Sequence, residues 1–147
     1  MIRAALIAAL LALTPPAAAQ QGWGDLDGLL RAQLLPPQAS LVGAFWLPDH
    51  ADPGQARRAL GIAFFEVANG GNSTNIATGY FLGTGTGWAF ANPVSGLFGQ
   101  GPRDVVYYED RVELTTTMPN PGDPRCCPTG EARWSVNIAT GAATRLR

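Results

Sequence analysis

The chain has 147 residues and a formal net charge of −1, with 10 basic residues, all of them arginine, against 11 acidic ones. Such a surface charge, with no large basic cluster, makes nucleic acid a poor partner. The lack of lysine excludes Schiff-base catalysis, a phosphate-loop lysine and an amine general base. This length suits a single domain.

The first 19 residues have the pattern of a secretory signal peptide. Arg3 supplies a positive start, residues 4–13 form an unbroken apolar run, and residues 17–19 give an A-x-A pattern before Gln20. The apolar run is about half the roughly 20 residues that a spanning helix needs, so cleavage is favoured over an uncleaved anchor. We expect residues 1–19 to be removed and residues 20–147 to form one secreted α+β domain, periplasmic or extracellular and not membrane-spanning.

The first predicted element of the mature domain is an amphipathic helix over residues 25–35. Leucines recur there at helical spacing, acidic residues occupy the first turn, and Pro36 and Pro37 end the pattern. Gly28 weakens an isolated helix by about 1 kcal/mol, so this helix depends on packing its leucine stripe against another surface.

From residue 40 onward, aliphatic and aromatic runs alternate with turn-forming clusters, which is typical of antiparallel strands. The predicted strands are 40–47, 59–67, 75–82, 87–91, 105–108, 111–118 and 133–138. The fold class we expect is therefore α+β: a mainly antiparallel β-sheet with one N-terminal amphipathic helix packed on it. The strand 59–67 has little polar alternation, which favours a central position with both faces covered.

The sixth and seventh predicted strands are natural partners in a long hairpin. Val112 and Leu114 share one face of the sixth strand opposite Glu113, and the seventh strand repeats the alternation from Trp134. Residues 119–131 between them include four prolines and cannot continue either strand. They form a loop longer than the two to five residues usual for hairpins, and such loops are often functional or specially stiffened.

Cys126 and Cys127 lie in that loop and are the only cysteines of the chain. Adjacent Cα atoms are about 3.8 Å apart across a trans peptide, below the usual distance in disulfides, so a bond between them closes a strained, easily reduced ring. Three hypotheses stay open: a rigid turn closed by a vicinal disulfide, two free thiols in a tight turn, and a redox-active or metal-responsive dithiol. Beyond the pair, the chain offers few soft or nitrogen ligands, so we expect neither a metal nor a cofactor.

Other catalytic patterns are weak. His50 lies in a turn-rich polar stretch, which favours a solvated histidine, and no serine has a G-x-S-x-G context. The glycine-rich segment 83–87 is not followed by a helix start or a lysine, so it predicts a turn between strands instead of a phosphate site.

Four acidic residues near the hairpin are the candidates for paired acid/base carboxylates, although a solvated face explains them better; they are Asp104, Glu109, Asp110 and Glu113. The large aromatic residues are expected to form much of the core, and some to line a ligand cleft. They include Trp46, Phe64, Phe65, Tyr80, Phe81, Trp88, Tyr107, Tyr108 and Trp134.

The segment 105–138 resembles a group of small exported bacterial proteins that share a D-P-x-C-C-P-[ST] motif, of which the LppP/LprE-type lipoproteins are an example. The motif is present here as Asp123-Pro124-Arg125-Cys126-Cys127-Pro128-Thr129. The resemblance implies an exported domain with the motif between C-terminal strands. This chain lacks the lipid-anchor cysteine.

We therefore expect an exported, non-enzymatic binding or cell-envelope accessory protein, with Cys126 and Cys127 as binding or redox candidates and an unknown protein or small molecule of the envelope as partner. The proline-bounded loop favours this interpretation because such loops often present contact surfaces. The alternative is a thiol-based redox or soft-metal-responsive periplasmic protein that uses the same pair.

Overall fold

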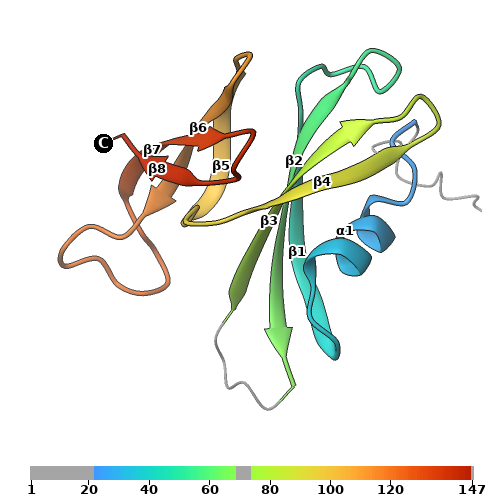
Figure 1. Cartoon of the computed structure of the whole chain (residues 1–147). Coiled ribbons are helices and arrows are strands. Elements are labelled where there is room, and N and C mark those ends of the chain that lie inside the picture. Colours follow the sequence, from blue (N-terminus) through green and yellow to red (C-terminus); the bar gives the residue numbers. More distant parts are fainter. Residues whose placement is uncertain (1–21, 69–73, 147) are drawn as a thin grey trace, which may run out of the picture.

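The computed structural model describes residues 22–68 and 74–146, which form one helix and eight strands (Figure 1). In chain order these are α1 (Leu26–Leu34), β1 (Ala39–Pro48), β2 (Arg58–Val67), β3 (Asn75–Gly83), β4 (Trp88–Val94), β5 (Gln100–Tyr107), β6 (Arg111–Met118), β7 (Gly130–Asn137) and β8 (Ala143–Arg145). The predicted signal peptide, residues 1–19, lies outside the described residues.

The strands form two four-stranded antiparallel sheets, each ordered as the chain runs: β1-β2-β3-β4 and β5-β6-β7-β8. The mainly antiparallel β character that the sequence predicts is confirmed. The helix is short, nine residues, with one fully buried side chain, Leu30. Among the described residues, no helix is both long and apolar enough to cross a membrane.

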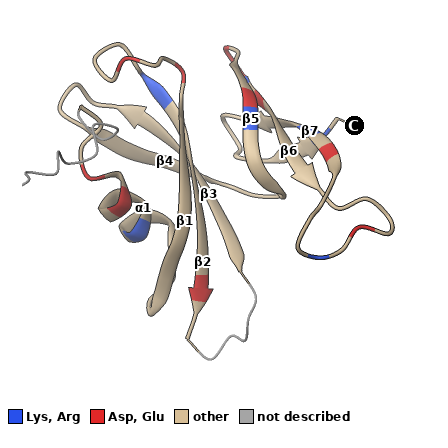
Figure 2. Cartoon of the chain, turned by 180° about the vertical axis from the view of Figure 1, so that it is seen from behind, with Lys and Arg blue, Asp and Glu red and all other residues tan. Residues whose placement is uncertain are grey.

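A shared apolar core holds the two sheets together. Its buried members come from both, among them Leu60, Ile62 and Tyr80 of the first sheet and Leu114 and Trp134 of the second. The first sheet carries charge only near the ends of β2, whereas the second sheet and the loops carry much more (Figure 2). Apolar side chains are therefore free to fill both faces of the first sheet.

The helix α1 covers the face of the first sheet that points away from the core (Figure 1). Asp25 caps its first turn by accepting a hydrogen bond from Gly28 N at 2.9 Å. The close approach of α1 to the sheet depends on Gly61 and Gly79, which face each other across β2 and β3. A Cβ atom at Gly61 would lie 2.5 Å from Leu30 Cδ2, and one at Gly79 would lie 2.7 Å from Leu34 Cδ2.

Polar contacts also join the sheets. The Tyr107 hydroxyl of β5 lies between β1 and β2, where it accepts from Leu60 N at 2.8 Å and donates to Leu47 O at 2.5 Å. Beyond β4, Ser95 N donates to Gly141 O at 2.9 Å and Ser95 O accepts from Ala143 N at 2.8 Å. The two sheets are thus tied at points far apart along the chain.

All the predicted strands are present, and all but the sixth differ from the prediction at one or both ends. The sixth is correct at both ends, and β2 is a central strand with both faces covered, as expected. β5 begins at Gln100 instead of residue 105, and the short β8 was not predicted. Tyr108 was wrongly assigned to the core: it lies outside β5, 38% exposed, with the Arg111 guanidinium 4.0 Å from its ring centre.

Candidate functional site

The loop between β6 and β7 is fastened at its base by the Asp123 carboxylate. This group accepts hydrogen bonds from Asn120 N at 2.8 Å, Thr129 N at 2.7 Å and Thr129 Oγ1 at 3.0 Å. The backbone donors of Asn120 and Thr129 hold the pKa of Asp123 below its usual value. One side chain therefore joins the two ends of the loop.

Cys126 and Cys127 lie in this loop with their sulfur atoms at disulfide distance. Both residues are exposed. The Cα atoms are 3.8 Å apart, and Cys127 N donates to Pro124 O at 3.0 Å, so the pair belongs to a tight turn. Of the three hypotheses from the sequence, the bonded pair describes this structure.

A pocket of about 270 Å³ lies beside the loop, at the open end of the core between the sheets. We call it the inter-sheet pocket. Its lining comes from β2 and β3, from the start of β5 and from the end of β6 with the following loop: Phe64, Thr74, Ile76, Gly99, Gln100, Thr117, Met118, Pro119, Arg125 and Pro128.

The apolar wall of the inter-sheet pocket is continuous with the core. Phe64, Ile76 and Met118 are half-buried and pack against the buried core residues on one side while they line the pocket on the other. An apolar group in this pocket would extend the core instead of resting on a polar surface. The pocket therefore suits an apolar chain.

Arg125 brings a positive charge to this pocket. It is the only charged residue among the described residues of the lining, and it directly precedes the cysteines. Among the described residues, its guanidinium has no hydrogen-bond or ion-pair partner. A ligand with an anionic end would find an unpaired cation there, and arginine binds carboxylates with two parallel hydrogen bonds.

The sequence predicts the loop but not the pocket beside it. Phe64 and Ile76 pair across β2 and β3 and lie more than 40 residues before the loop. Only the packing of the two sheets brings them to Met118 and Arg125. The sequence signal was modest: Met118 and Pro119 are apolar residues at the point where β6 ends and the loop begins.

The residues weighed for catalysis lie elsewhere. His50 is in the exposed turn after β1, where its Nδ1 accepts a hydrogen bond from Asp52 N at 3.0 Å. The described residues that line the inter-sheet pocket include no histidine, cysteine or acidic residue. Within residues 22–68 and 74–146, no group of three such side chains gathers as metal ligands would.

The acidic residues of the hairpin bind arginines on the outer side of the second sheet. Glu113 accepts from Arg111 Nε at 3.0 Å and from Arg133 Nη2 at 2.9 Å, and these hydrogen bonds lower its pKa. Asp110 pairs with Arg111 at 3.0 Å, while Glu109 is exposed in the β5–β6 turn. Asp104 is also exposed, 3.9 Å from Arg103. These contacts describe a solvated cross-strand network, not two carboxylates that face each other in a cleft.

No family model matches the chain, and neither a curated protein nor a solved structure matches it. The resemblance to the LppP/LprE-type lipoproteins therefore stays a prediction that rests on the motif at residues 123–129.

Proposed function

We propose that the protein is an exported, non-enzymatic binding protein of the cell envelope whose inter-sheet pocket holds a medium-chain fatty acid. The observation that carries this proposal is the pairing of an apolar wall, continuous with the core, with the Arg125 cation, which has no partner among the described residues. The acyl chain would lie against Phe64, Ile76 and Met118, and its carboxylate would bind Arg125.

The size of the pocket favours a single chain. Its volume of about 270 Å³ is slightly below the range of roughly 300–1,000 Å³ common for small-molecule sites, so it suits one acyl chain better than a whole lipid. Each buried methylene contributes about 0.8 kcal/mol. Two further carbons should therefore tighten binding by about tenfold until the chain fills the pocket.

The loop gives the cation a defined position. The Asp123 hydrogen bonds close its base, the bonded cysteines form a tight turn directly after Arg125, and Pro124 and Pro128 bracket this segment. A stiff loop loses little conformational entropy when a ligand binds, so more of the interaction free energy appears as affinity.

The export part of the proposal rests on the sequence of residues 1–19 and on the chemistry of the pair at 126–127. Disulfides persist mainly in oxidising compartments. The motif shared with exported lipoproteins agrees with this location. Mass spectrometry of the protein from a fractionated producing cell tests it: a periplasmic or secreted chain that starts at Gln20 supports export, and an intact chain in the cytosol contradicts it.

Calorimetric titration with hexanoate, octanoate and decanoate tests the ligand. We expect about tenfold tighter binding per two carbons, and octanol at least tenfold weaker than octanoate because it cannot pair with Arg125. Arg125→Gln should remove the preference for octanoate over octanol. Arg31→Gln, on the exposed side of α1, is the matched control and should change nothing.

Two results would overturn this assignment. One is an affinity that does not depend on chain length, and the other is an Arg125→Gln protein that still prefers octanoate over octanol by the wild-type factor.

A second candidate function, thiol redox or soft-metal response, is favoured by one observation: both bonded cysteines are exposed and open to a reductant. Equilibration in glutathione buffers followed by alkylation and mass spectrometry separates the two. A pair half-reduced between about −180 and −230 mV supports a working dithiol, and one still oxidised below about −300 mV supports a structural bridge.

A further inference from the structure

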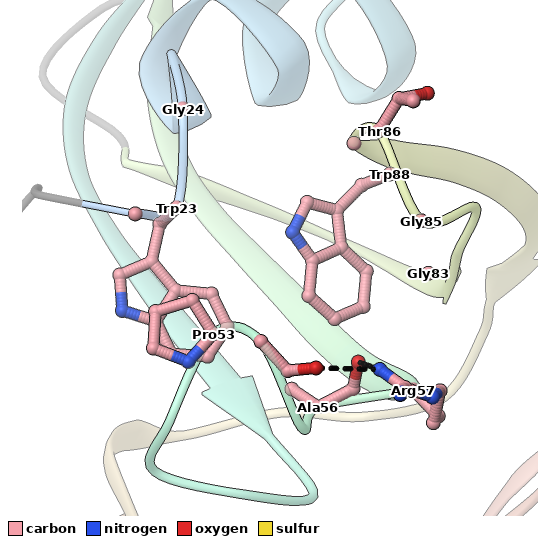
Figure 3. Close-up of a pocket in the computed structure, with 12 residues that line it drawn as sticks. Trp23, Gly24, Pro53, Ala56, Arg57, Gly83, Gly85, Thr86 and Trp88 are labelled. Carbon is pink, nitrogen blue, oxygen red and sulfur yellow. Dashed lines mark hydrogen bonds between the residues drawn. The ribbon is translucent and has the colours of Figure 1, made fainter.

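A second pocket, of about 370 Å³, lies at the opposite end of the first sheet from the inter-sheet pocket. Three segments far apart in the sequence build it: residues 22–24 before α1, residues 53–57 before β2, and residues 83–88 at the turn from β3 to β4. We call it the tryptophan pocket because Trp23 and Trp88 supply its large side chains (Figure 3).

The two indole rings are held in place. Their centroids are 6.0 Å apart with 25° between the ring planes, so the rings are close to parallel. Trp46 packs edge-on against Trp88, with centroids 5.0 Å apart and 79° between the planes, and Trp46 in turn contacts Phe81 at 5.2 Å. Trp88 is therefore anchored to the aromatic side chains under α1.

Arg57 gives the tryptophan pocket its charge. Its Nη1 donates to Gly54 O and to Ala56 O, each at 3.0 Å, which fixes the guanidinium at one side of the pocket (Figure 3). Its Nε and Nη2 make no hydrogen bond with the described residues. Among the described residues that line the pocket, no other side chain is charged, so this site favours an anionic group over an ammonium group.

Much of the remaining wall is backbone. Gly24, Gly85 and Gly87 line the pocket, and a Cβ atom added at any of them would meet nothing within 4 Å. Gly24 and Gly85 have φ values of +77° and +85°, which favour glycine there. Open peptide groups beside flat aromatic rings can bind hydroxyl groups, which a purely apolar pocket cannot do.

We propose that the tryptophan pocket binds an acidic monosaccharide, a pyranose ring with a carboxylate. The C–H groups of the sugar ring would pack on the indole faces, the hydroxyl groups would bond to the peptide groups of Gly85 and Thr86, and the carboxylate would accept hydrogen bonds from Arg57 Nε and Nη2. This site is independent of the inter-sheet pocket and of its ligand.

NMR titration of the ¹⁵N-labelled protein with glucuronate tests the proposal. We expect the indole N–H signals of Trp23 and Trp88 to shift, those of Trp134 to stay, and glucose to bind at least tenfold more weakly because it lacks the carboxylate. Arg57→Gln should lower the affinity for glucuronate to that for glucose, and Trp23→Leu should lower the affinity for both sugars. Arg125→Gln, in the other pocket, is the matched control and should leave the titration unchanged.

The wild-type protein alone can overturn the inference, whatever the variants do to folding. Glucuronate that leaves both indole signals unmoved at about 10 mM would exclude useful affinity. Acetate that binds as tightly as glucuronate would reveal a mere anion site, and benzoate or a nucleotide that binds more tightly would point to an aromatic ligand.

Discussion

At the residue scale, the Tyr107 hydroxyl is a half-buried polar contact between the two sheets. It satisfies one backbone donor of β2 and one backbone acceptor of β1. Burial is the main reason that the pKa of Tyr107 is raised. The hydroxyl therefore keeps its proton, and with it the hydrogen bond that it donates, throughout the physiological pH range.

Tyr107→Phe should lower the free energy of unfolding by about 1–3 kcal/mol, because Leu60 N and Leu47 O lose their partner in a site with little access to water. Urea unfolding followed by tryptophan fluorescence measures this change. Tyr108→Phe is the control and should cost less than about 0.5 kcal/mol, because Tyr108 is exposed. Equal losses in the two variants would show that the Tyr107 contacts carry no stability of their own.

The hydrogen bonds of the Asp123 carboxylate should make the conformation of the loop sensitive to acid. This carboxylate is stabilised in the folded state, so its pKa lies below the ordinary 3.8. The stabilisation is therefore fully present above about pH 4 and is lost as the pH falls through the lower, folded-state pKa. The amide signals of Asn120 and Thr129 should shift together with a midpoint below 3.8 in an NMR pH titration. A midpoint at or above 3.8, or an Asp123→Asn protein whose loop amides keep the wild-type shifts at pH 7, would contradict the role of this carboxylate.

At the scale of the elements, the seat of α1 depends on two glycines that face each other in the sheet. Gly79→Ala would place a Cβ atom 2.7 Å from Leu34 Cδ2 and 2.8 Å from Phe90 Cε2. We expect a loss of about 1–3 kcal/mol, as is usual for overpacking. Gly43→Ala in β1 is the matched control, since a Cβ atom there meets nothing within 4 Å. It should be neutral or stabilise the protein by up to about 1 kcal/mol. If thermal unfolding gives both variants the same stability, the packing of α1 does not depend on a glycine at position 79.

The elements also show how far local patterns lead. β7 and the first half of β6 could be predicted because apolar and polar residues alternate along them, and that period is a property of each strand alone. β5 was shortened because Gly101 and Pro102 resemble a turn; the structure accommodates them in an irregular edge strand with two register shifts and a positive φ at Asp104. The three residues of β8 carry too little pattern to be recognised.

The sites were harder to foresee than the strands. Cys126 and Cys127 were found because their spacing is unusual in itself, and the turn at 83–87 was found because glycine clusters have local meaning. Trp88 was expected in the core, but only the approach of Trp23 and Arg57 makes it the wall of a pocket. That approach depends on contacts between segments about 30 residues apart, which no local period encodes.

At the scale of the whole molecule, the two sheets should unfold as one unit because they share a core and have polar ties at Tyr107 and at Ser95. Far-UV circular dichroism and tryptophan fluorescence should give coincident urea transitions. Leu114→Ala should lower the free energy of unfolding by about 2–5 kcal/mol in both measurements, since Leu114 is fully buried in the shared core. Ser135→Ala, on the outer face of β7, should move neither. Two separated transitions would mean that the sheets are independent.

At this scale the protein consists of two packed sheets, with the inter-sheet pocket beside a loop whose base is closed by hydrogen bonds to Asp123. Within the described residues, the candidate acids are paired with arginines or exposed, and the inter-sheet pocket is lined by none of them.

The most direct measurement is the set of intermolecular NOEs between decanoate and the methyl-labelled protein. The account predicts contacts from the acyl chain to the methyl groups of Ile76 and Met118, and contacts from the methylene beside the carboxylate to Arg125. Acyl contacts to Trp23 and Trp88 instead, or no intermolecular contact under saturating decanoate, would contradict it.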